Sequence, residues 1–258
     1  MAAEWTRVGK RASTWRQSDT PDSIARLDDI AADYVGVLHR TLRENPTAFG
    51  LYEAARAGGQ RLTASMPSIW ELSQNGDEFI TRFTRAVGGD GGTMADAAVR
   101  RAAAVSARKL VQALDQQSQA GAPPHPGGLS GDMFCMVYQW FFADVVAEFL
   151  RSAIAEKVKL VVPFLPAVDP EDHIADWVAE HVMSLLPNPC EEAAELQEAV
   201  DTAQAVASTA EDPLGALRLA AERLVPQMAG RALGLLTDPD DSEGGTTADT
   251  SHRGEPAA

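Results

Sequence analysis

Cysteine is almost absent from this chain of 258 residues, which holds only Cys135 and Cys190. The two form neither a CxxC pair nor a spacing typical of zinc ligands. Nothing therefore resembles a disulfide framework, and a reducing cytoplasm is the location that we expect. Residues 1–19 also lack the uninterrupted apolar core of a signal peptide, which argues against Sec-type export.

Basic residues are scarce in the second half of the chain. Residues 1–119 hold 15 Lys and Arg against 14 Asp and Glu, whereas residues 120–258 hold 7 against 23. No lysine or arginine lies between Lys159 and Arg218. A field of this sign repels phosphate backbones and anionic lipid, so we expect no nucleic-acid partner. It suits either a basic protein partner or solvation alone.

Strand patterns are missing as well, because no alternating apolar run with a hairpin turn occurs, and this predicts an all-α fold. At five places a capping residue is followed at once by proline. This marks a helix start, since the capping oxygen accepts a first-turn N–H and proline at the next position loses no hydrogen bond. The five are Thr20-Pro21, Asn45-Pro46, Asp169-Pro170, Asn188-Pro189 and Asp212-Pro213.

These signals and the apolar periodicity predict a set of helices. We expect a long helix over 21–44, shorter ones over 46–57, 60–66, 68–73 and 77–87, and a long one from Thr93 to about 119, opened by a capping box with Asp96. After these we expect helices over 130–160, 170–186, 189–210 and 213–236.

Composition divides the chain into parts. The run from Gly121 to Gly128 holds three prolines and three glycines, which cannot continue a helix. Residues beyond 237 are too polar to offset chain entropy by burial. The predicted organisation is a basic N-terminal arm (1–19), an N-terminal helical part (20–120), a Pro/Gly linker (121–129), an acidic C-terminal helical part (130–236) and a disordered acidic tail (237–258).

The helix over about 130–160 is apolar on nearly every side, which predicts the central helix of a multi-helix bundle. It approaches the length of a bilayer span, but its charged residues are expensive in lipid. Asp144 and Glu148 predict a narrow polar stripe with Gln139, Arg151 and Ser152, either solvated or closed by a Glu148–Arg151 pair. A di-iron site would need an ExxH motif on each of two helices, and none is present.

The same periodicity predicts the core. We expect burial of Ile30, Tyr34, Leu38, Phe134, Val137, Phe141, Val145, Phe149, Ile174, Trp177, Val178, Leu196 and Leu224.

The N-terminal arm is a candidate binding element. Trp5, Val8, Ala12 and Trp15 recur at helical spacing among basic residues. One interpretation is an amphipathic arm that contacts a protein partner or a membrane surface. The other is that the tryptophans dock onto the chain's own acidic half. The candidate partner-binding residues are Trp5, Arg7, Lys10, Arg11, Trp15 and Arg16.

Two aspartate motifs raise a different possibility. Asp28, Asp29 and Asp33 read DDxxxD, and a later helix carries Asp172 and Asp176 as DxxxD. This resembles the paired motifs of head-to-head isoprenoid synthases of the squalene and phytoene synthase type, in these short segments only. The resemblance implies that Asp29, Asp33, Asp172 and Asp176 bind Mg²⁺ and a diphosphate.

Other patterns fail on context. Gly88 to Thr93 forms a glycine-rich loop before a helix, but no strand precedes it and no lysine stands where a P-loop needs one. His173 and His181 are separated by roughly 12 Å along a helix, too far to share one zinc ion.

We therefore expect a non-enzymatic α-helical interaction, regulatory or assembly protein. It would bind another macromolecule, most simply a protein, through its acidic half or its basic arm. No cofactor is expected, and Mg²⁺ enters only under the isoprenoid alternative. The arginine- and alanine-rich composition with few lysines suggests a high-GC bacterial origin.

Overall fold

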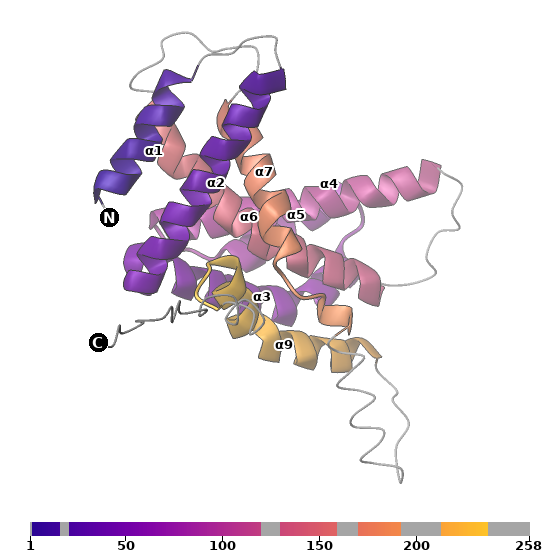
Figure 1. Ribbon diagram of the computed structural model, residues 1–258. Helices are drawn as coiled ribbons and strands as arrows, with labels where there is room; N and C mark the ends of the chain where they lie inside the picture. Colours follow the sequence, from indigo (N-terminus) through magenta and orange to yellow (C-terminus); the bar gives the residue numbers. More distant parts are fainter. Residues whose placement is uncertain (1, 16–20, 120–129, 159–169, 192–212, 237–258) are drawn as a thin grey trace, which may run out of the picture.

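The regular elements are all helical in the computed structural model, which describes residues 2–15, 21–119, 130–158, 170–191 and 213–236 (Figure 1). The all-α prediction is confirmed for these residues. The helices are α1 (Ala2–Thr14), α2 (Pro21–Glu44), the 3₁₀ turn η1 (Ala48–Gly50), α3 (Leu51–Leu72), α4 (Gly76–Gly88), α5 (Met94–Gln119), α6 (Gly131–Val158), α7 (Pro170–Ser184) and α9 (Pro213–Ala232).

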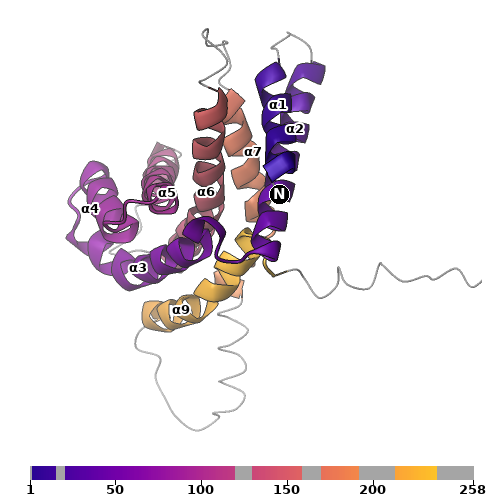
Figure 2. The same ribbon diagram turned by 90° about the vertical axis from the view of Figure 1, so that its left-hand side faces the viewer.

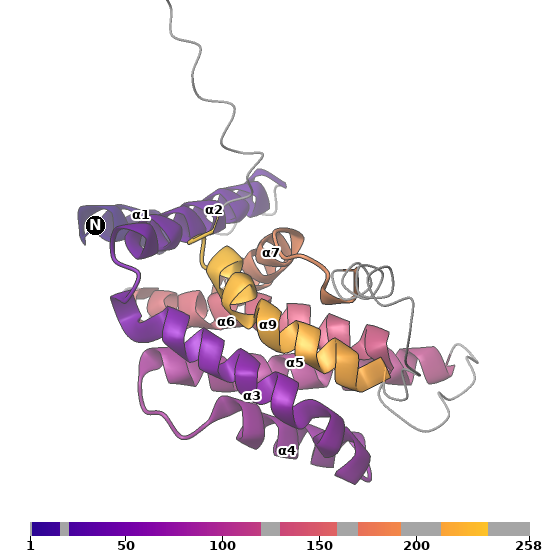
Figure 3. The same ribbon diagram turned by 90° about the horizontal axis from the view of Figure 1, so that it is seen from below.

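Helix α6 is the centre of the bundle, as predicted. Figure 2 shows α1 and α2 on one side of the α6–α7 pair and α3, α4 and α5 on the other, and Figure 3 shows α9 lying along α3. Residues 131–155 are long and apolar enough to cross a membrane, but 83% of their most apolar window is buried. That burial is what a core helix requires.

Side chains cap several helix starts. The Asn75 side chain accepts the Glu78 N–H at 2.9 Å at the start of α4. Thr93 and Asp96 form the expected capping box, because each accepts the other's backbone N–H, at 3.0 and 3.1 Å. The predicted helix over 21–44 is confirmed by α2.

Helix α3 corrects the prediction of separate short helices over 46–57, 60–66 and 68–73. It runs unbroken through Gly58, Gly59 and Pro67. A Cβ added to Gly58 would lie 2.7 Å from Cζ of Phe141, and one added to Gly59 would lie 2.5 Å from Cζ of Phe142. The glycines are therefore contact points for α6 and do not break the helix, because tertiary packing overrides their low helix propensity.

The two cysteines form a disulfide, so the expectation that the chain has no disulfide framework is wrong. Cys135, near the start of α6, is bonded to Cys190, just after α7, with the Cα atoms 5.9 Å apart. The disulfide could not be predicted from the sequence, because the two cysteines are far apart in the chain and only the packing of α7 against α6 brings them together.

Most of the predicted core is confirmed. Trp177 of α7 is only partly buried. The buried residues are Ile30, Tyr34, Leu38, Leu224 and the other predicted core residues of α6 and α7. Leu196 lies outside the described residues. So do residues 16–19 of the arm, the linker 121–129, most of the predicted helix over 189–210, and the tail 237–258.

Candidate functional sites

Helix α1 is held against α2 by its two tryptophans. The Trp5 indole N–H donates to the Thr41 hydroxyl at 3.1 Å, and the Trp15 indole N–H donates to the Ser23 carbonyl at 3.0 Å. Val8, between them in sequence, is fully buried. Both indoles therefore dock on the chain itself, and their hydrogen bonds go to α2 and not to the acidic half.

The outer face of α1 is cationic. Arg7, Lys10 and Arg11 are all exposed, and their spacing places them on one side of the helix. Arg11 forms an ion pair with Asp33 of α2. Arg7 and Lys10 form none with any residue that the structure describes. The sixth candidate of the arm, Arg16, lies outside the described residues.

A hollow of about 380 Å³ adjoins this cationic face (Figure 1 shows the two helices side by side). It opens between the end of α1 and the beginning of α2. Its lining consists of Arg11, Thr14, Trp15, Arg26 and Ile30. Arg11 is already paired with Asp33, which leaves the Arg26 guanidinium, beside an indole and an aliphatic side chain, for a carboxylate attached to an apolar stem.

The aspartates of the two motifs have separate partners. Asp33 is paired with Arg11, and Asp172 is paired with Arg151 of α6 at 2.8 Å. Asp29 and Asp176 are exposed. Within the described part of the chain, no three His, Cys, Asp or Glu side chains are close enough together to hold a metal ion.

The histidines of α7 have separate partners. His173 Nε2 of α7 lies 2.8 Å from Asp28 Oδ1 of α2. The first aspartate motif therefore contacts α7 through an aspartate–histidine pair. His181 stacks on Trp177 with ring centroids 4.9 Å apart. The first contact joins α7 to α2, whereas the second lies within α7.

A polar seam, defined by Asp144, Glu148 and Arg151 of α6 with Ser106 and Lys109 of α5, runs through the core. Asp144 is 3% exposed and accepts from the Lys109 ammonium at 2.6 Å and the Ser106 hydroxyl at 3.0 Å. Burial raises the pKa of the Asp144 carboxyl, while Lys109 and Ser106 oppose that rise. Opposite charge therefore compensates this buried carboxylate.

Glu148 continues the seam one turn later. It is 4% exposed and pairs with Arg151 at 3.0 Å, one of the two predicted alternatives, and no described residue forms a hydrogen bond with its Oε2 atom. Burial raises the pKa of the Glu148 carboxyl, against the charges of Arg151 and Arg101. The seam links α5, α6 and α7 by charge, and both buried acids have a cation beside them.

The glycine-rich loop over 88–92 is held by arginines. Arg61 Nε donates to the Val87 carbonyl at 2.8 Å, and Arg100 donates to the carbonyls of Gly89 and Gly91 at 2.9 Å each. These guanidinium groups satisfy carbonyls at the end of α4 and beyond it. Their arrangement is a cap for this end of α4.

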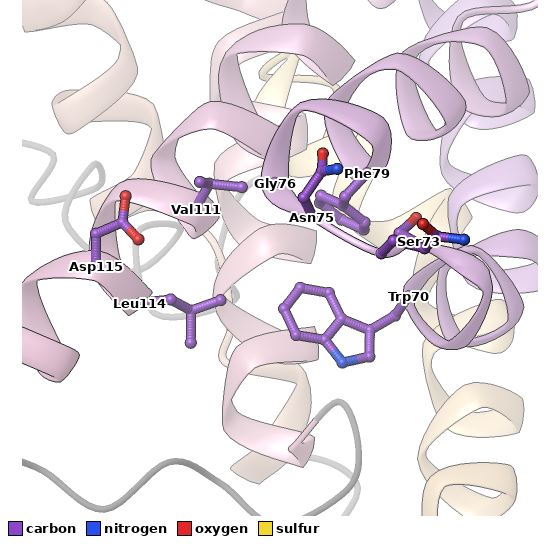
Figure 4. A pocket seen from close by; sticks show the side chains of 9 residues that line it. Trp70, Ser73, Asn75, Gly76, Phe79, Val111, Leu114 and Asp115 are labelled. Atoms are coloured by element: carbon purple, nitrogen blue, oxygen red, sulfur yellow. The ribbon is translucent and has the colours of Figure 1, made fainter.

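An apolar pocket lies where α3 ends, α4 begins and α5 passes (Figure 4). It has a volume of about 300 Å³. Sequence reasoning missed it, because the lining residues come from segments that are remote in sequence, although Val111 and Leu114 are spaced as neighbours on one helix face. We name it the α3–α5 pocket, and it is lined by Trp70, Ser73, Gln74, Asn75, Gly76, Phe79, Val111, Leu114 and Asp115.

Comparisons of the chain with protein-family models, with curated proteins and with solved structures find no match, so the function is inferred from the geometry alone.

Proposed function

We propose that this chain is a non-enzymatic helical interaction protein that binds an acidic segment of a protein partner through the outer face of α1. One observation carries the proposal. The apolar side of α1 is fixed on α2, while Arg7 and Lys10 on its other side are exposed and form no ion pair with a described residue.

A fixed helix is a suitable binding element because its cations are already positioned. Little conformational freedom of the backbone has to be lost on binding. The hollow beside Arg11 and Arg26 would accept a carboxylate from the partner, and charge complementarity of this kind contributes mainly to specificity and association rate.

The acidic half is the weaker candidate for the binding face. Three of its carboxylates, Asp144, Glu148 and Asp172, already pair with cations of the chain itself. Exposed acids do remain on α7 at Asp176 and Glu180. They face solvent, where an acidic surface also supports solubility.

The test is affinity capture from a native lysate, comparing the wild-type chain with the charge reversal Arg7→Glu/Lys10→Glu. A matched control is Arg218→Glu/Arg223→Glu, which changes the same amount of charge on exposed positions of α9. We expect a stoichiometric protein partner with the wild type and the control and its loss with the α1 variant. A partner retained by the α1 variant would refute the site, and no partner for folded protein would refute the interaction class.

Sedimentation with phosphatidylserine-containing vesicles covers the membrane alternative. Binding that depends on Arg7 and Lys10 in vesicles, without a protein partner, would reassign the α1 face to a membrane surface.

A cytoplasmic location in a high-GC bacterium stays a prediction. Disulfides are rare in a reducing cytoplasm. Thiol labelling of the native protein in lysates quenched with acid would test the location: unreactive Cys135 and Cys190 point to an oxidising compartment, whereas reactive thiols support the cytoplasm.

A further inference from the structure

The α3–α5 pocket has an apolar interior. Phe79 is 2% exposed and contacts the half-buried Trp70 edge-to-face, with ring centroids 5.2 Å apart. Val111 and Leu114 of α5 are partly buried and line the pocket opposite them, as Figure 4 shows. A partly open apolar hollow of this kind gains free energy when an apolar group displaces its water.

The surroundings of the pocket are negative. Asp115 lies in the lining and has no ion pair with a described residue, and no lysine or arginine lines the pocket. Glu71 and Asp77, both exposed, are sequence neighbours of the lining residues Trp70 and Gly76.

The two helix ends at the pocket carry opposite partial charges and offset each other. Helix α3 ends at Leu72 with its negative C-terminal end, and helix α4 begins at Gly76 with its positive N-terminal end. On α5, Arg108 is the cation on the same face as Asp115, but it is two turns away, roughly 10 Å along the axis. The carboxylates of Asp115, Glu71 and Asp77 therefore set the sign of the field at the pocket, which favours a cationic ligand.

Two polar groups of the rim already have partners within the chain. The Ser73 hydroxyl donates to the Ile69 carbonyl at 2.6 Å, and the Asn75 side chain accepts from the Glu78 N–H at 2.9 Å. The volume of about 300 Å³ is at the lower limit for small-molecule sites. A single large side chain carried by a polypeptide fits these conditions better.

We infer that the α3–α5 pocket binds a Leu, Met, Phe or Trp side chain of a protein partner that carries Lys or Arg about one helical turn away. The apolar side chain would fill the space between Trp70 and Leu114, and the cation would pair with Asp115. Apolar anchors in a pocket are the residues that dominate binding at protein interfaces. This site is separate from the α1 face, and its test does not depend on whether the α1 face binds a partner.

The experiment is selection of a random peptide library displayed on phage against the full chain, with depletion on the Leu114→Lys variant. We expect enriched peptides that share an apolar anchor and a basic residue three or four positions away. Their affinity, measured by fluorescence anisotropy, should fall at least about tenfold in Leu114→Lys and about threefold in Asp115→Asn.

The matched controls are Leu219→Lys on α9 and Asp22→Asn on α2, which make the same changes at exposed positions and should leave peptide affinity unchanged. Circular dichroism verifies folding of each variant. Asp115→Asn keeps the charge test available even if Leu114→Lys unfolds.

Three outcomes would overturn the inference: no enrichment over the depleting variant, enriched peptides without basic residues, or affinities insensitive to both pocket substitutions. A fourth would reassign the site. If 2-phenylethylammonium shifts the Trp70 indole resonance while no peptide is enriched, the pocket takes a small organic cation and not a protein segment. Failure of Arg7→Glu/Lys10→Glu in the capture experiment leaves these results untouched.

Discussion

The two sides of α6 are packed by different kinds of contact. Toward α3 the helix presents the aromatic rings of Phe141 and Phe142 to Gly58 and Gly59, and the rings come close to the α3 backbone because the glycines have no side chain. Toward α5 and α7 it presents the carboxylates of Asp144 and Glu148, each beside a cation. One side depends on shape and the other on charge compensation, so the two sides should respond differently to mutation and to pH.

The largest effect is expected on the aromatic side. Phe141→Ala should lower the free energy of unfolding by about 3–5 kcal/mol, because the ring is fully buried and its removal leaves a cavity. Urea denaturation followed by circular dichroism measures this. Replacement of the exposed Leu219 by Ala is the control, and an equal loss there would contradict the packing argument.

The covalent link at the start of α6 should have a comparable effect. Cys135→Ser/Cys190→Ser removes a crosslink that spans 55 residues, and loop-closure entropy predicts a loss of about 4 kcal/mol. Denaturation of the wild type with and without reductant should give the same difference. An unchanged midpoint on reduction would show that this link does not stabilise the fold.

On the charged side, Lys109→Met should lower the free energy of unfolding by about 1–3 kcal/mol. The substitution leaves the buried Asp144 carboxylate without its cation, although the Ser106 hydroxyl remains. Adding Asp144→Asn should recover part of the loss, since a neutral amide needs no cation. If the loss in the double variant equals the sum of the losses for Lys109→Met and Asp144→Asn measured singly, the two side chains are not coupled.

A smaller effect tests the close approach itself. Gly59→Ala should lower the free energy of unfolding by about 1–3 kcal/mol, because the new Cβ would lie 2.5 Å from the buried Phe142 ring. Gly36→Ala in α2 meets no atom within 4 Å and should instead stabilise by about 0.5–1 kcal/mol through helix propensity. If thermal denaturation shows that both substitutions change stability in the same direction, the close contact of Gly59 with Phe142 is refuted.

The smallest effect concerns pH. Burial raises the pKa of Asp144 and Glu148, so the folded chain binds protons at a higher pH than the unfolded chain does. These two groups should therefore raise the free energy of unfolding as pH falls from neutral to about 4, the ordinary pKa of a carboxyl group.

The double variant Asp144→Asn/Glu148→Gln isolates this contribution. It should show a smaller rise in the free energy of unfolding over that pH range than the wild type shows, in urea denaturation at matched ionic strength. Identical slopes would mean that the seam does not titrate differently on folding.

Local signals predicted the helices that depend on local chemistry. The Thr20-Pro21 start and the apolar spacing predicted α2, and the Thr93–Asp96 box predicted the start of α5. Gly58 and Gly59 misled the same reasoning, because their purpose is contact with α6 and not an end of α3. The Glu148–Arg151 pair was predictable since it lies within one helix, whereas Lys109–Asp144 joins two helices and was not.

The sequence by itself determined the all-α class, the central apolar helix and the burial of most residues in the predicted core, because periodicity and capping act over a few residues. Only the tertiary structure decided that Trp5 and Trp15 dock on α2, that Cys135 meets Cys190, and that an apolar pocket opens between Trp70 and Leu114. These features join segments far apart in the chain, and their existence depends on how whole helices pack.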